Sequence, residues 1–141
     1  MVEVLRVAVE PCGLCALDAP LQLEIAFRAT GGGALPKAHW ELRFVADLVH
    51  HQLPVELTLD ASESQSESEG ERIEILRASS ASWQPVLALP QPALESLGLL
   101  EARLLADEAP GPARELALVR LVADVRRSGD QVLRGLLDPF K

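Results

Sequence analysis

Aromatic residues are scarce in this sequence, which has no tyrosine, three phenylalanines and two tryptophans. Sites that stack nucleic-acid bases or sugars need aromatic rings, so such a stacking platform is not expected. Positive charge is also short, because 13 Lys and Arg against 21 Asp and Glu leave a net charge of −8. A surface that follows a phosphate backbone must be basic, so direct nucleic-acid binding is not expected either.

The sequence also lacks long apolar runs and an export signal. No stretch of 18 apolar residues could form a membrane-spanning helix, and the N-terminus does not follow the pattern of a secretion signal. The two cysteines, Cys12 and Cys15, are therefore expected to be reduced thiols in an intracellular protein, cytoplasmic or nuclear. The 141 residues are 48% hydrophobic, which predicts one domain (1–141) with a core of leucine, valine, alanine and isoleucine.

Alternation of apolar and polar residues predicts several β-strands. The clearest is 21–28, in which Leu21, Leu23, Ile25 and Phe27 share one face. Trp40 faces inward in the segment 39–46, as do Ile73 and Ile75 in 71–77. Further strands are expected at 2–10, 53–59, 83–89, 99–105 and 115–126. Short strands separated by Gly- and Pro-rich loops predict an all-β fold, an immunoglobulin-like antiparallel β-sandwich.

Two short helical elements are expected beside these strands. Residues 92–97 form one helical turn that Gly98 stops. Residues 128–137 are predicted to form a short amphipathic C-terminal helix, which Ser128 or Asp130 caps.

An acidic, serine-rich segment at 60–71 is predicted to be a solvated loop. Residues 60–74 hold six acids and one arginine, a net charge of −5. Glu63, Glu67 and Glu69 are candidate partner-binding residues, because a dense negative charge attracts a basic partner. Ser64, Ser66 and Ser68 each precede a glutamate by three residues, a spacing that favours acid-directed phosphorylation. A loop that only adds solubility is the alternative.

The run 116–125 is the candidate docking edge of a sheet. Arg120, Asp124 and Arg126 lie on one of its faces, and an extended partner segment can pair with a free strand edge. A central strand with solvated charges is the alternative.

Nothing in the sequence predicts catalysis or a bound cofactor. The Cys12-Gly13-Leu14-Cys15 spacing fits a redox pair or half of a zinc site, but no second cysteine pair follows. His39, His50 or His51 would have to complete a zinc site. Adjacent His50 and His51 point to opposite sides of an extended chain and have no apparent acid–base partner. The protein is therefore expected not to be an enzyme.

Several segments resemble the anti-silencing-function histone chaperones. Residues 20–27 (PLQLEIAF) are similar to the family's Pro-Phe-x-Phe-Glu-Ile-x-Phe strand, and residues 39–45 (HWELRFV) to its Leu-Glu-Trp-Lys strand. Residues 93–99 and 118–121 (LVRL) match its late segments, with the latter similar to Phe-Ile-Arg-Val. The resemblance implies an immunoglobulin-like sandwich and a histone-binding role, in which Arg120 contacts a histone carboxyl terminus. His50-His51 stands where the family has a Tyr-Asp pair.

The sequence as a whole thus favours a non-catalytic protein–protein interaction module within a larger assembly, histone-chaperone-like in its resemblance. The partner is another protein, and the acidic segment favours a basic one. The alternative is a β-sandwich that carries a lipid or prenyl group in its Leu- and Val-rich interior.

Overall fold

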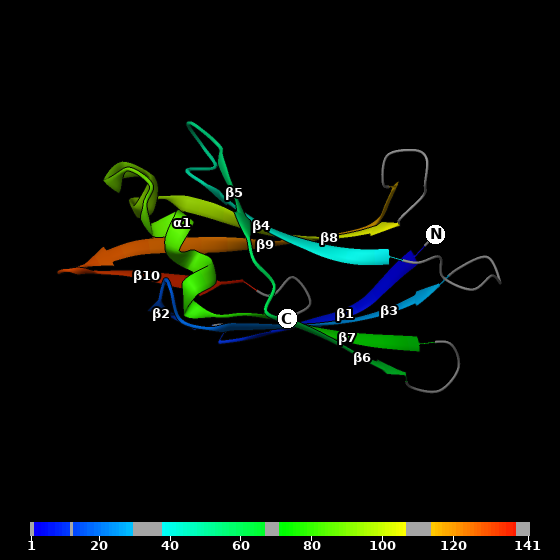
Figure 1. The fold of residues 1–141 in the computed structure, drawn as a ribbon. Coiled ribbons are helices and arrows are strands. Elements are labelled where there is room, and N and C mark those ends of the chain that lie inside the picture. Colours follow the sequence, from blue (N-terminus) through cyan, green and yellow to red (C-terminus); the bar gives the residue numbers. More distant parts are fainter. Residues whose placement is uncertain (1, 12, 30–37, 67–70, 107–113, 138–141) are drawn as a thin grey trace.

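Two antiparallel β-sheets face each other in the computed structural model, which describes residues 2–11, 13–29, 38–66, 71–106 and 114–137 (Figure 1). The four-stranded sheet has the order β1 (Val2–Glu10), β3 (Leu21–Ala29), β7 (Glu71–Ala78) and β6 (Ala61–Ser66). The six-stranded sheet has the order β2 (Cys15–Ala16), β10 (Gln131–Leu136), β9 (Arg114–Ser128), β8 (Leu97–Ala106), β4 (Ala38–Ala46) and β5 (Leu53–Leu57). The prediction of an all-β antiparallel sandwich is confirmed.

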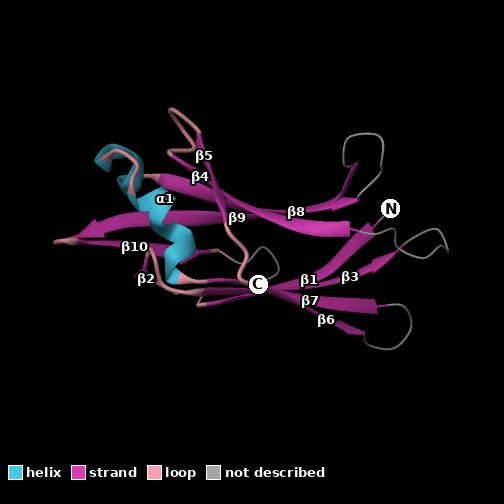
Figure 2. Cartoon of the chain, in the orientation of Figure 1, coloured by secondary structure: helices cyan, strands magenta, loops and turns pink. Residues whose placement is uncertain are grey.

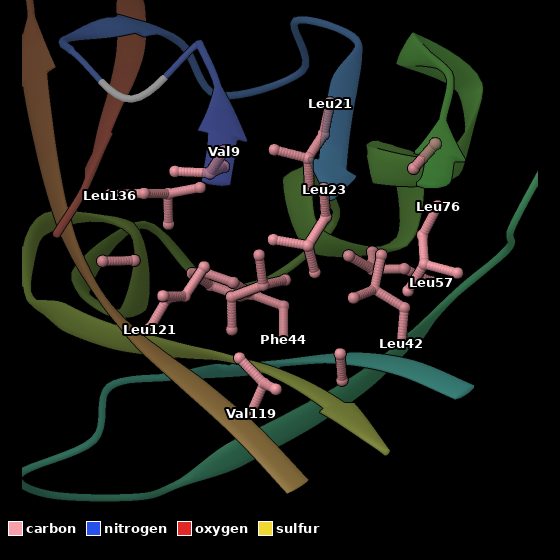
Figure 3. Packing of buried hydrophobic residues seen from close by; sticks show 14 of the residues in the cluster. Val9, Leu21, Leu23, Leu42, Phe44, Leu57, Leu76, Val119, Leu121 and Leu136 are labelled. Atoms are coloured by element: carbon pink, nitrogen blue, oxygen red, sulfur yellow. The ribbon is translucent and has the colours of Figure 1, made fainter. Parts of the chain in front are cut away.

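The core lies between the sheets and is mainly aliphatic (Figure 3). Successive side chains of a strand point to opposite faces, and the inward ones include Leu23 and Phe27 of β3 and Leu42 and Phe44 of β4, which belong to one core cluster. Trp40 is buried, as predicted, and its ring stands edge-on to Phe27 with the ring centres 6.1 Å apart. All four aromatic residues in the described part of the chain, Phe27, Trp40, Phe44 and Trp83, are buried.

A helical segment closes one end of the sandwich (Figure 2). It consists of the 3₁₀ helix η1 (Ser80–Trp83), the helix α1 (Gln84–Leu87) and the 3₁₀ helix η2 (Gln91–Glu95). The expectation of an extended stretch at 83–89 is therefore wrong, because Pro85 occupies the first turn of α1, where proline suits a helix. Trp83 and Val86 are fully buried. Among the described helices, none is long and apolar enough to cross a membrane.

The predicted C-terminal helix is wrong, because residues 131–136 form β10, which pairs with β9. Gly129 adopts φ +60° in the turn between the two strands, a backbone conformation that glycine tolerates. Arg134 of β10 points inward and is fully buried. It donates hydrogen bonds to the carbonyl oxygens of Ala16, Leu17 and Ala19, and its guanidinium lies 4.5 Å from the centre of the Trp83 ring. A buried arginine in this strand made its sequence look like an amphipathic helix.

The acidic segment is partly a strand rather than a loop. Residues 61–66 form β6, which pairs with β7 at the edge of the four-stranded sheet, so the loop predicted for 60–71 is wrong over these residues. Serine occurs at every second position from 62 to 66, and alternation with a period of two is a sequence pattern typical of a β-strand.

The side-chain direction predicted for β7 is also reversed. Leu76 joins the core cluster beside Glu74, whose carboxylate accepts a hydrogen bond from the Trp40 indole. Ile73 is buried on the other face of the sheet and Ile75 is half-buried there. The buried indole donor accounts for the inward acid, since an unpaired buried N–H is costly.

Candidate interaction face

The predicted docking edge is a central strand. Strand β9 pairs with β8 on one side and with β10 on the other, so 116–125 offers no free edge and that prediction is wrong. Its two faces are nevertheless as predicted, because Arg120, Asp124 and Arg126 share the face turned away from the core. The structure therefore brings these three residues together on the outer face of the six-stranded sheet. Any docking there must use the face rather than the edge.

A row of apolar side chains crosses this outer face. Register places Val122 of β9 next to Leu99 of β8, Leu99 next to Val45 of β4, and Val45 next to Pro54 of β5. Leu137, just after β10, donates its backbone N–H to the carbonyl oxygen of Val122. We call these five residues the outer stripe, and none of them belongs to the core cluster. Val122 and Leu137 are exposed, by 37% and 62% respectively.

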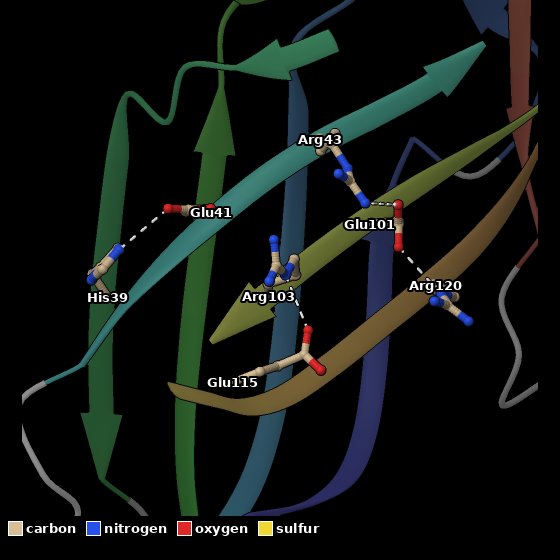
Figure 4. A network of polar contacts seen from close by, with 7 residues as sticks. All are labelled: His39, Glu41, Arg43, Glu101, Arg103, Glu115 and Arg120. Atoms are coloured by element: carbon tan, nitrogen blue, oxygen red, sulfur yellow. Dashed lines mark hydrogen bonds and ion pairs between the residues drawn. The ribbon is translucent and has the colours of Figure 1, made fainter. Parts of the chain in front are cut away.

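A charged row runs beside the outer stripe, two residues away from it on each strand. We define it as Arg120, Glu101, Arg43 and Glu56, which follow one another across β9, β8, β4 and β5. Figure 4 shows three of its members, Arg120, Glu101 and Arg43. Glu101 accepts hydrogen bonds from both arginines, from Arg43 Nη2 at 2.7 Å and from Arg120 Nε at 3.2 Å. Glu101 is 4% exposed, so the two guanidiniums stabilise a nearly buried carboxylate.

The charge state of Glu101 follows from these contacts. Burial by itself raises the pKa of Glu101, because a desolvated carboxylate is unfavourable. The hydrogen bonds and charges of Arg43 and Arg120 outweigh burial and hold the pKa below its ordinary value of 4.5. At neutral pH the outer face therefore carries an ionised Glu101 between two arginines.

A hollow of about 400 Å³ lies where the outer stripe meets the charged row. Its lining includes Val45, Leu99 and Pro54 of the stripe, together with Arg43, Glu101 and Arg120. Leu48 and Gln52, from the turn after β4, also line it. Four of its lining residues are apolar and four are polar or charged, so a ligand side chain in the hollow would meet both kinds of group.

The turn that supplies Leu48 and Gln52 is fixed by Asp47. Nδ1 of His51 lies 2.6 Å from Oδ2 of Asp47, and the Ser96 hydroxyl donates a hydrogen bond to Oδ1. The hydrogen bond with His51 is the main reason that the pKa of Asp47 is lowered from 3.8, against burial, which raises it. His51 is exposed, and its contact with Asp47, four residues earlier, is one that the sequence analysis did not identify.

Those of the other predicted residues that the structure describes lie away from this face. Glu63 lies on β6, at the edge of the opposite sheet, and Glu67 and Glu69 lie outside the described residues. Cys15 is half-buried on β2, with its thiol 3.7 Å from the carbonyl oxygen of Arg134, and Cys12 also lies outside the described part of the chain. Within the described ranges, no group of three His, Cys, Asp or Glu side chains could hold a metal ion.

Sequence reasoning missed most of the outer stripe because its members are apolar. An apolar residue in a predicted strand is normally assigned to the core. Val122 carried a usable signal, since it lies between the charged Arg120 and Asp124 on the same face of the strand. Leu137 carried none, because its segment was assigned to a helix.

Comparison with known proteins adds no relative to this picture. No family model matches the chain, and no curated protein matches it either.

Proposed function

We propose that this protein is a non-catalytic interaction module that docks a partner polypeptide on the outer face of its six-stranded sheet. The observation that carries the proposal is the outer stripe itself, a continuous apolar row with its exposed members Val122 and Leu137. A sheet face turned to water is ordinarily polar, so an apolar row in which Pro54, Val122 and Leu137 are exposed favours a binding surface; Val45, at the centre of the row, is buried. The charged row at its side fits the polar rim that surrounds the apolar centre of an interface.

A point substitution tests this use of the face. Val122→Asp places a charge in the outer stripe without disturbing the buried side of β9. Thr58→Asp is the matched control, because Thr58 is exposed, has the shape of valine and lies outside both the stripe and the charged row. Both variants and the wild type are used as baits for affinity purification and mass spectrometry in the native cell, after circular dichroism has confirmed that each is folded.

The expected result is a set of proteins captured by the wild type and by Thr58→Asp but lost with Val122→Asp. Identical capture by all three baits would remove the outer stripe as the docking surface.

The resemblance to the anti-silencing-function chaperones favours an intracellular partner of the core-histone class. Purified core histones and the two variants above test this narrower proposal directly. Saturable binding that Val122→Asp abolishes would support it. The two variants have the same net charge. Equal binding of histones to both would show that binding depends only on net charge, and would contradict the narrower proposal.

A second candidate is the carriage of a lipid or prenyl group, which a hollow of about 760 Å³ at the end of the four-stranded sheet favours. Pro11, Pro20, Leu21 and Ala78 contribute to its lining. The space between the sheets is filled by packed side chains, so an apolar group would occupy this hollow. Native mass spectrometry of the purified protein tests this candidate: a co-purifying lipid would support it, and a protein-only spectrum after expression in its native cell would contradict it.

A further inference from the structure

The charges at the hollow are unbalanced. Three charged residues line it, Arg43, Arg120 and Glu101, which gives two positive charges against one negative. Both carboxylate oxygens of Glu101 already accept a hydrogen bond. Glu56, the neighbour of Arg43 in the charged row, does not line the hollow. A chain with a net charge of −8 thus has a local excess of positive charge in the lining of this hollow, whereas the charged row as a whole is neutral.

Arg120 is the group available to a ligand. Only its Nε contacts Glu101, and 61% of its side chain is exposed. Arg43, by contrast, is 33% exposed and donates from Nη2 to Glu101. Because a guanidinium has five N–H donors in a planar fork, Arg120 can hold Glu101 through Nε and still bind a second carboxylate.

The length of the outer stripe indicates how long a bound polypeptide segment would be. Its five residues lie on or next to five neighbouring strands, and strands in a sheet are spaced about 4.8 Å apart, so the stripe is roughly 19 Å long. A helix of about 12 to 13 residues or an extended segment of about 6 covers that length. A short polypeptide segment is therefore sufficient.

We propose that the outer face binds a segment of a partner protein in which a single carboxylate side chain lies among apolar ones. The carboxylate binds Arg120 at the mouth of the hollow, and the apolar side chains cover the outer stripe. The rest of the segment is neutral or basic, because the net charge of this chain disfavours a strongly acidic ligand. This inference rests on the proposed function and adds the chemistry of the partner.

A random-sequence display library of sixteen-residue peptides, selected on the full-length protein, is the test. Selected peptides are synthesised and their Kd values are measured by fluorescence anisotropy for the wild type, Arg120→Gln, Val122→Asp and Arg6→Gln. Arg6 is the matched control, since its side chain is 55% exposed and it lies on β1 of the opposite sheet, 4.0 Å from Glu24. Circular dichroism and thermal unfolding of each variant identify any that is misfolded.

We expect the selected peptides to carry one Asp or Glu with apolar neighbours. Changing that acid to its amide should weaken binding about tenfold, or about 1.4 kcal/mol, as should Arg120→Gln, because each change removes the same charge-assisted hydrogen bond. Both changes together should weaken binding little more than either alone, since they remove the same contact. Arg6→Gln should leave the Kd unchanged.

Three results would overturn the inference. One is a library that yields no peptide, and another is peptides whose Kd responds equally to Arg120→Gln and Arg6→Gln. The third is peptides without an acid that bind the outer stripe, as judged by loss of binding to Val122→Asp. The third result contradicts only the role of the carboxylate and leaves the proposed function supported. Failure of this inference can therefore be distinguished from failure of the proposed function.

Discussion

Glu101→Gln is the substitution that tests the electrostatics of the outer face most directly. The change keeps the shape of the side chain but removes the negative charge and turns an N–H₂ group toward one of the guanidiniums. A buried hydrogen bond to a charged group contributes about 1.5–3 kcal/mol. This range applies to the contact with Arg43, whose side chain is 33% exposed. The contact with Arg120 is discounted to about 0.5 kcal/mol, because that side chain is 61% exposed and solvent screens it.

The expected loss is therefore about 2–3.5 kcal/mol in the free energy of unfolding, measured by urea denaturation at pH 7. Glu24→Gln is the control, since Glu24 forms an exposed pair with Arg6 at 4.0 Å. Its loss should be roughly 0.5 kcal/mol or less, as for other surface pairs. A loss for Glu101→Gln no larger than that of the control would refute the view that the two arginines depend on a buried carboxylate.

The contribution of Glu101 to stability depends on pH, and the direction of this dependence follows from its pKa. Because the pKa of Glu101 is lower in the folded protein than its ordinary value of 4.5, its contribution to stability is fully present above about that pH. The contribution is lost as the pH falls through the folded-state pKa. The stability difference between the wild type and Glu101→Gln should therefore narrow below about pH 4.5, and a constant difference from pH 7 to pH 3 would contradict the assigned ionisation.

Three further substitutions test the fold by chemical denaturation. Trp40→Ala should lower the free energy of unfolding by about 3–5 kcal/mol, because the indole is 7% exposed, and a near-neutral result would place it outside the core. Gly98→Ala should cost about 1–3 kcal/mol, since a Cβ atom there would lie 2.6 Å from the ring of Phe44, and a stability equal to wild type would show that the approach is looser. Arg134→Met should cost about 3 kcal/mol or more, because three carbonyl oxygens of residues 16–19 lose their donor. Hydrogen exchange of amides 15–19 should accelerate in this variant, and unchanged protection would mean that Arg134 does not hold the segment.

The local pattern of the sequence was sufficient to predict most strands and the antiparallel sandwich. Alternation with a period of two depends only on neighbouring residues, so the inward face of β3 and the burial of Trp40 followed from it. The outward position of Arg120, Asp124 and Arg126 on β9 followed for the same reason.

Where a strand lies in its sheet could not be predicted in this way, because pairing joins residues far apart in the chain. Strand β9 is central because β8 and β10 pair with it on either side, and nothing within 116–125 encodes those neighbours. The outer stripe is assembled by the same long-range register, from single residues on separate strands.

Buried polar side chains account for the remaining differences. From the sequence, Arg134 and Glu74 were expected to face solvent. The pattern therefore predicted a helix at 128–137, and it assigned the inward and outward faces of β7 the wrong way round. In the folded protein each has partners supplied by distant segments, carbonyl oxygens of residues 16–19 for Arg134 and the indole of Trp40 for Glu74. Local periodicity thus determined which segments are strands, whereas the tertiary structure decided their neighbours and the placement of charges inside, because only the assembled sheets supply the partners that make a buried polar group stable.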